Sequence, residues 1–153
     1  MPKISQAKAK ERIEVLIKEA ENSDTDSMRF LADIYSDGEY LPKDDIAAEA
    51  WLRKAAELGD DDAKLRLAKM LSNCKGVAKN LEEAFNINYE LMFEGWADAM
   101  IEVGNALKEG KGVEKDEEQG EFYLNFGKSI IEDFTESDER AEKMYEDLKF
   151  KKK

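Results

Sequence analysis

The sequence predicts an all-α protein, an α-solenoid of stacked helix–turn–helix repeats. Its main support is internal similarity, because the chain aligns with itself at a shift of 36 residues in three stretches that begin at Ser27, Ala63 and Ala99. Within each stretch, apolar residues recur every three or four positions, which is the period of an amphipathic helix. Two prolines and nine glycines are few for 153 residues, so little interrupts a helical backbone.

The first predicted element is a helix over residues 5–22. Its sequence places Ile13, Leu16, Ile17 and Ala20 on one face. The segment lies about 36 residues before the second helix of the first repeat, so it corresponds to half a repeat. We therefore expect it to cap the N-terminal end of the stack.

Each of the three repeats, over 25–60, 61–96 and 97–132, opens with an amphipathic helix. Two apolar positions four residues apart complete the stripe of this helix; the pairs are Leu31 and Tyr35, Leu67 and Leu71, and Val103 and Leu107. A left-handed C-terminal cap is expected next, at Gly38 and Gly110, with Cys74 at the same position of the second repeat.

The second helix of each repeat begins at a capping residue. These N-caps are Asp44, Asn80 and Asp116. Gly59 and Gly95 end the first two of these helices, whereas Ile131 stands at that position in the third repeat and leaves its end open. A closing helix is expected over 135–150, since it starts with capping residues and places Ala141, Met144, Tyr145 and Leu148 on one face. Together these elements predict a single domain over 1–153.

The repeated positions form a recognisable pattern. A small residue precedes Leu and then Ala or Gly, a glycine turn with G-V-x-K follows, and an Ala-rich helix ends in W-L-R-K-A-A-E-L-G. The pattern resembles the Sel-one-like repeat, a relative of the tetratricopeptide repeat, over about residues 27–131. The best single match is AEAWLRKAAELGDDDA at Ala48–Ala63, and the third repeat departs most. The resemblance implies a right-handed superhelix of helix pairs that scaffolds protein–protein contacts, and it does not imply an enzyme.

The charge of the chain is concentrated in one segment. Residues 21–62 carry thirteen acidic and four basic side chains, a net charge of −9 out of −12 for the whole chain. A field of this sign repels nucleic acid and anionic membranes and speeds the capture of basic partners. We therefore expect a protein partner with a basic surface; the alternative is that the charge serves solubility alone.

The chain carries little that indicates export or a membrane. Cys74 is the single cysteine, so no disulfide can form within the chain, in keeping with a reducing compartment. The first twenty residues contain no apolar core of signal-peptide length, and Glu11 and Glu14 interrupt them. No apolar run is long enough to span a bilayer. A cytoplasmic location is expected.

The sequence offers little chemistry. It contains no histidine, which removes the commonest general base and metal ligand. The run Asp60–Asp61–Asp62 lacks the spacing of a calcium loop, and GKGVEKD lacks that of a phosphate-binding loop. We expect no catalytic, cofactor-binding or metal-binding residues, and hence no enzyme.

A partner is expected in the concave groove, which the first helix of each repeat lines. Positions between the apolar stripes face this groove: Asp26, Arg29, Asp33, Ser36, Asp62, Leu65, Lys69, Ser72, Asp98, Ile101, Asn105 and Lys108. Leu65 and Ile101 are either exposed anchors or an extension of the buried stripe. The three recurring aspartates either face the groove or cap their helices. Tyr40 and Trp96, near loops, are either anchors or core residues.

The sequence thus predicts a protein-binding adaptor or inhibitor with an acidic-to-mixed groove, a monomer without cofactor. One concrete form that the resemblance allows is a bacterial immunity protein, which would neutralise a basic toxin by electrostatically steered capture. A structural or homo-oligomeric scaffold is a second hypothesis. A small-ligand binder or enzyme that uses groove carboxylates is a third.

Overall fold

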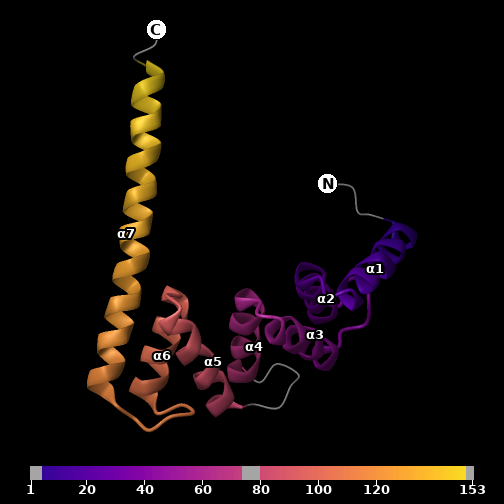
Figure 1. Ribbon diagram of the computed structural model, residues 1–153, viewed down its shortest axis with the longest axis horizontal. Helices are drawn as coiled ribbons and strands as arrows, with labels where there is room; N and C mark the ends of the chain where they lie inside the picture. Colours follow the sequence, from indigo (N-terminus) through magenta and orange to yellow (C-terminus); the bar gives the residue numbers. More distant parts are fainter. Residues whose placement is uncertain (1–4, 74–79, 151–153) are drawn as a thin grey trace. The chain divides into compact units, whose positions relative to one another are not determined.

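The computed structural model of the chain (Figure 1) describes residues 5–73 and 80–150, with side chains as far as residue 135. These residues form helices and no strand, which confirms the all-α solenoid class. The helices are α1 Gln6–Glu21, α2 Thr25–Asp37, α3 Asp45–Glu57, α4 Asp61–Asn73, α5 Leu81–Phe93, α6 Ala97–Glu109 and α7 Glu117–Phe150. The C-terminal cap position predicted at Cys74 lies outside the described residues.

Two backbone hydrogen bonds recur with the 36-residue period. One joins each first helix to the preceding helix; its amide and carbonyl partners are Asp24 and Glu19, Asp60 and Ala55, and Trp96 and Leu91, each at 3.1 Å. The other ties the start of each second helix to the first; its partners are Asp44 and Tyr35 (2.9 Å), Asn80 and Leu71 (3.1 Å), and Asp116 and Leu107 (2.9 Å). Because the same bonds satisfy the helix ends in every repeat, the period of the sequence is also a period of the structure.

Side-chain caps set where the helices begin. The predicted caps of the second helices are confirmed: an Oδ1 atom of Asp44, Asn80 and Asp116 accepts a hydrogen bond from the backbone amide three residues on, at 3.0 Å in each case. Asp24 and Asp60 cap α2 and α4 in the same way, and Trp96 holds this position before α6. These caps lie two residues before Asp26, Asp62 and Asp98. The capping interpretation of those three aspartates is therefore wrong, and they occupy the first turns instead.

The chain forms two compact units, residues 1–88 and 89–153, where we expected one domain. In the first unit the helices pack in chain order, α1 on α2, α2 on α3, and α3 on α4 (Figure 1). Its core combines large apolar residues with alanines that let the helices approach closely; among the fully buried members are Leu31, Ala48, Ala55, Ala63 and Leu71. The boundary falls inside α5, so the second repeat is shared between the two units.

In the second unit, α6 and α7 lie side by side and glycines set their separation (Figure 1). A Cβ atom on Gly104 of α6 would lie 2.7 Å from the carbonyl oxygen of Gly120 and from the backbone nitrogen of Leu124. A Cβ atom on Gly120 would meet the Gly104 oxygen at 2.8 Å. Backbone thus packs directly on backbone, which explains why the third repeat has glycine where the others have alanine.

α7 differs from the prediction, because it continues where a separate helix over 135–150 was expected. Neither glycine nor proline occurs between Gly127 and Phe150, so nothing breaks the helix. The Thr135 hydroxyl, read as part of a helix start, donates to the carbonyl oxygens of Ile131 and Glu132 at 3.0 and 2.9 Å. A hydroxyl that bonds back to its own helix is compatible with a helix interior.

Candidate protein-binding surface

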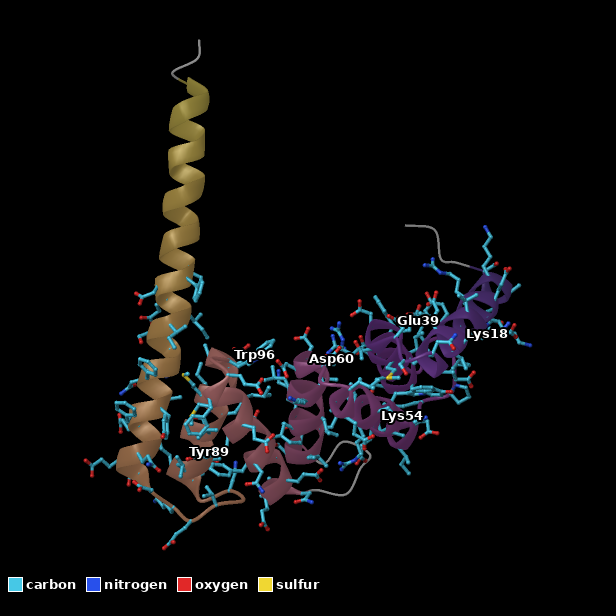
Figure 2. The ribbon with its side chains drawn as sticks, in the orientation of Figure 1. Lys18, Glu39, Lys54, Asp60, Tyr89 and Trp96 are labelled. Atoms are coloured by element: carbon cyan, nitrogen blue, oxygen red, sulfur yellow. The ribbon has the colours of Figure 1, made fainter. Side chains whose placement is uncertain are left out.

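The exposed face of α2 and α4 carries a network of ion pairs centred on Arg29. Its guanidinium contacts Asp26 on its own helix, Asp60 at the start of α4 (Figure 2) and Asp62 in the first turn of α4. The last two contacts are 3.1 Å long and run between first helices of neighbouring repeats. Arg29 therefore links α2 to α4 by ion pairs, at the surface where a partner was expected.

The environment of Arg29 keeps it charged. Burial lowers the pKa of its guanidinium, but the carboxylates of Asp60, Asp26 and Asp62 raise it more, so the net pKa lies above its ordinary value. The Nε atom is buried and lies near Asp60 Oδ2 without the alignment of a hydrogen bond. The Asp60 side chain is only 9% exposed and also caps Ala63 at 2.8 Å, so this contact is the part of the network most shielded from water.

A second pair lies further along the same two helices. Arg66 of α4 places Nη1 2.7 Å from Oδ1 of Asp33 on α2. Arg66 was not among the predicted groove residues. The signal that could have found it is a spacing, because both Arg29–Asp62 and Asp33–Arg66 join residues 33 positions apart, one helical turn short of the repeat.

The other candidates of the first unit lie on the same helices with varied exposure. Lys69 is exposed, whereas Ser36, Leu65 and Ser72 are half-buried. The Ser72 hydroxyl donates to the carbonyl oxygen of Ala68 at 2.8 Å, so its polarity serves its own helix. The structure therefore brings Asp26, Arg29 and Asp62 together in one ion-pair network and places Asp33 in a second pair on the same two helices.

In the second unit, two of the four candidates lie against α7. A Cβ atom on Gly127 would meet Cγ1 of Ile101 at 3.0 Å, and the Lys108 side chain would meet one on Gly120 at 2.7 Å. Lys108 Nζ also lies 3.7 Å from Glu121. These contacts favour Ile101 as part of the packed stripe rather than as an exposed anchor. Asp98 is exposed and Asn105 half-buried on α6.

The second helices carry an ion pair that sequence reasoning missed. Arg53 of α3 reaches Glu83 of α5 with two guanidinium nitrogens, at 2.5 and 3.1 Å, and Glu49 on its own helix at 2.8 Å. The hydrogen bond with Arg53 outweighs burial and lowers the pKa of Glu83, and the bond to Glu83 likewise raises that of Arg53. A bidentate pair of this kind orients the two helices.

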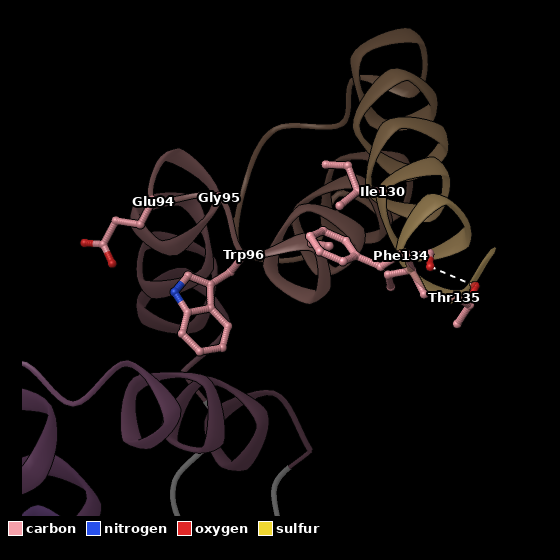
Figure 3. Close-up of a pocket in the computed structure, with 8 residues that line it drawn as sticks. Glu94, Gly95, Trp96, Ile130, Phe134 and Thr135 are labelled. Atoms are coloured by element: carbon pink, nitrogen blue, oxygen red, sulfur yellow. Dashed lines mark hydrogen bonds between the residues drawn. The ribbon is translucent and has the colours of Figure 1, made fainter. Parts of the chain in front are cut away.

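Tyr40 and Trp96 each line an apolar cavity. Tyr40 closes one of about 440 Å³ between α1 and the α2–α3 loop, together with Ile13, Ile17, Tyr35 and Leu41. Trp96 faces another of about 450 Å³ within the second unit, where Ile130, Ile131 and Phe134 of α7 form the opposite wall (Figure 3). Both rings are partly packed, so each lies between the two interpretations made from the sequence, an exposed anchor and a core residue.

The part of the chain that the structure describes contains neither a membrane-spanning helix nor a metal-binding cluster. None of its helices is long and apolar enough to cross a membrane. Across residues 5–73 and 80–135, whose side chains are described, no group of three acidic or sulfur side chains is arranged to hold a metal ion.

Comparisons with known proteins agree on one family. A family model described as Sel1 repeat matches residues 25–60, 61–86 and 97–126, more than half of the chain. A solved Sel1 repeat protein from Oxalobacter formigenes is 26% identical, with a TM-score of 0.65 over 78% of this chain and 90% of that one. A protective antigen of uropathogenic Escherichia coli with an SLR fold is 25% identical, with a TM-score of 0.72 over 77% of this chain. The match spans a quarter of that antigen's length. No curated protein matches the chain.

Proposed function

Because the chain belongs to the Sel1-repeat family, we propose that it is a protein-binding module whose partner lies on the exposed face of α2 and α4. The repeats of this family generally mediate protein–protein contacts, and their fold is typically a non-catalytic scaffold. In this chain the partner carries a basic surface, and the module acts as an adaptor or inhibitor.

The observation that carries this proposal is the exposure of carboxylates on that face. Asp26, Asp33 and Asp62 leave 70%, 53% and 53% of their side chains in water, although each pairs with an arginine. Exposed ion pairs of this kind contribute about 0–1 kcal/mol each. A partner's arginine or lysine can therefore replace Arg29 or Arg66 at one of these carboxylates with little loss.

Arg66 lies outside residues 21–62 and makes the face less acidic than their linear count, which already includes Arg29. With Arg29 and Arg66, the acidic part of the groove becomes a mixed network that presents both positive and negative side chains to a partner. Such complementarity favours specificity and the rate of capture more than affinity. An immunity protein that neutralises a basic toxin is the concrete form that fits this face best, with the chain acting as a monomer in the cytoplasm.

The test compares two triple charge reversals. One variant carries Asp26→Lys, Asp33→Lys and Asp62→Lys on the α2–α4 face, and the control carries Glu82→Lys, Glu90→Lys and Glu132→Lys at exposed positions elsewhere. A partner captured from the source cells by the wild-type chain is produced recombinantly, and its affinity is measured by calorimetry. We expect the first variant to weaken binding at least about tenfold and the control to change it by less than about twofold. Equal effects of the two variants would refute the proposal.

A second candidate is self-association through α7. The rings of Phe122 and Phe126 are exposed and stack with their centres 6.1 Å apart, and Tyr123 packs edge-on against Phe122 at 5.5 Å. Exposed aromatic clusters are enriched in interfaces. Light scattering at micromolar concentration separates the two: a monomer of 17.5 kDa removes this candidate, and a dimer that Phe122→Asp dissolves supports it.

A further inference from the structure

We propose that a basic amphipathic helix of the partner protein docks along the outer edge of α2, beside Phe30, and extends the series of first helices by one. This inference rests on the proposed function and specifies the partner's binding element. We call the surface the α2 edge and define it by Asp26, Phe30 and Asp37, with Val15 of the neighbouring α1.

The contact between α2 and α4 supplies the template for this docking. Towards α2, helix α4 presents Asp62 and Arg66, which pair with Arg29 and Asp33. Shifted back by one repeat, these two positions are Asp26 and Phe30 on α2. On the side of α2 away from α4, the described residues contain no further first helix. The surface of α4 that faces α2 therefore corresponds to a surface of α2 that no first helix covers among the described residues.

Phe30 is a large apolar side chain placed where water covers it. It is 60% exposed, and its counterpart Arg66 pairs with the neighbouring first helix. The residues next to Phe30 on the helix surface are acidic and exposed: Asp26 lies four positions before it, Asp33 three after and Asp37 seven after. An exposed aromatic ring with exposed carboxylates at neighbouring helix positions matches an apolar stripe that basic residues flank.

The helix α1 leaves a corresponding apolar position uncovered. Val15 is 51% exposed, and one repeat later its counterpart is Trp51, which packs against the core. Trp51 lies on α3, and α3 packs against α2, the first helix of the same repeat. By the same geometry, a helix seated on the α2 edge would cover both Val15 and Phe30, as α2 packs on α3 and forms ion pairs with α4.

The charges identify the occupant. Arg29 of α2 contacts Asp62 of α4, so a docked helix in the same geometry would present an arginine or lysine to Asp26. In the observed pair, Asp33 of α2 faces Arg66 of α4. Phe30 stands at the position of Arg66 one repeat earlier, so the docked helix would present an apolar residue to it in place of Asp33. The occupant is therefore a helix with an apolar stripe and basic flanks, which is the mode of recognition that lays an amphipathic helix into a groove.

A designed peptide provides the probe. It carries residues 24–39 of this chain with Asp26→Lys, Phe30→Lys, Asp33→Leu and Asp37→Lys, so that it keeps the buried face of α2 and gains the basic flanks and the leucine. The unmodified peptide, with the same buried face but acidic flanks, is the control. Fluorescence anisotropy of the labelled peptides measures binding to the full chain. We expect micromolar binding of the basic peptide and at least about tenfold weaker binding of the control.

Phe30→Asp is the decisive variant. It adds a negative charge, so a purely electrostatic attraction would become stronger, whereas docking on the ring would weaken at least about tenfold. Phe93→Asp, at a similarly exposed phenylalanine of the second unit, should leave the affinity unchanged. Circular dichroism of both variants checks the fold, and Phe30→Ala offers a milder truncation with the same expected direction.

Three results would overturn the proposal. They are no peptide binding below about 1 mM, binding that Phe30→Asp leaves unchanged or strengthens, and a wild-type dimer that Phe30→Asp converts to a monomer, because a second copy then covers the edge. If the captured partner still depends on Asp33 and Asp62, the proposed function stands while the α2 edge fails. Loss of both dependences removes both.

Discussion

Replacing Gly104 by alanine should destabilise the second unit, because the close approach of α6 and α7 leaves no room for a methyl group. The added Cβ atom would lie 2.7 Å from two backbone atoms of α7, the Gly120 oxygen and the Leu124 nitrogen. Favourable contacts between heavy atoms need about 3.5–4.0 Å, so the helices would have to separate by about 1 Å. Backbone atoms cannot rotate aside as a side chain can.

The magnitude follows from two opposing effects. Overpacking costs about 1–3 kcal/mol, and the rigidity of the contacting atoms puts this site at the upper end. Alanine in place of glycine in a helix stabilises by about 1 kcal/mol. The net loss in the free energy of unfolding is about 2 kcal/mol, or about 4–8 °C in melting temperature for a chain of this size.

Urea unfolding followed by circular dichroism measures this loss. Asn125→Ala, at an exposed position of α7, is the matched control and should stabilise by a few tenths of a kcal/mol. Gly120→Ala should resemble Gly104→Ala, since its Cβ atom meets Gly104 O at 2.8 Å. The double variant should lose less than the sum, because the first methyl group already separates the helices. Unchanged or increased stability of Gly104→Ala would refute this account of the packing.

Further predictions concern the ion pairs. Arg29→Met should cost about 1–3 kcal/mol in urea unfolding, because it leaves the shielded carboxylate of Asp60 without its cation. Arg66→Met removes a more exposed pair and should cost less than about 1 kcal/mol; the reverse order would contradict the assignment. The pair of Arg53 and Glu83 should make stability depend on pH. Since the folded state lowers the pKa of Glu83, its contribution is present above its ordinary value of 4.5 and is lost as pH falls through the folded pKa. The difference in unfolding free energy between wild type and Arg53→Met should therefore shrink from pH 7 to pH 3, and a constant difference would argue against the pair.

The repeat and its second-helix caps could be predicted from the sequence because they depend on local rules. A hydrogen bond from an amide to the side chain three residues earlier needs only an Asp or Asn at one position, and Asp44, Asn80 and Asp116 satisfy it. The period of the apolar stripe placed Leu31, Leu67 and Val103 in the core for the same reason.

The length of α7 and the pairing of the surface charges depend on a choice between alternative conformations, and the sequence does not show which one is more stable. Thr135 can start a helix or bond back within one, and no glycine or proline after Gly127 interrupts the continuous helix. Arg66 could equally have faced water, and only the approach of α2 to α4 places Asp33 within reach. The sequence therefore predicted Arg29 and Asp33 as groove residues, but it did not predict that Asp33 pairs with Arg66.

The central claim is that the α2–α4 face holds a partner protein, and site-specific photo-crosslinking in source cells tests it most directly. A benzophenone amino acid replaces Asp33 in one variant and the exposed Asn125 of α7 in another. We predict a crosslinked species of one defined partner, identified by mass spectrometry, from position 33 and none from position 125. Crosslinking of that partner from position 125 alone, or from neither position, would contradict the claim.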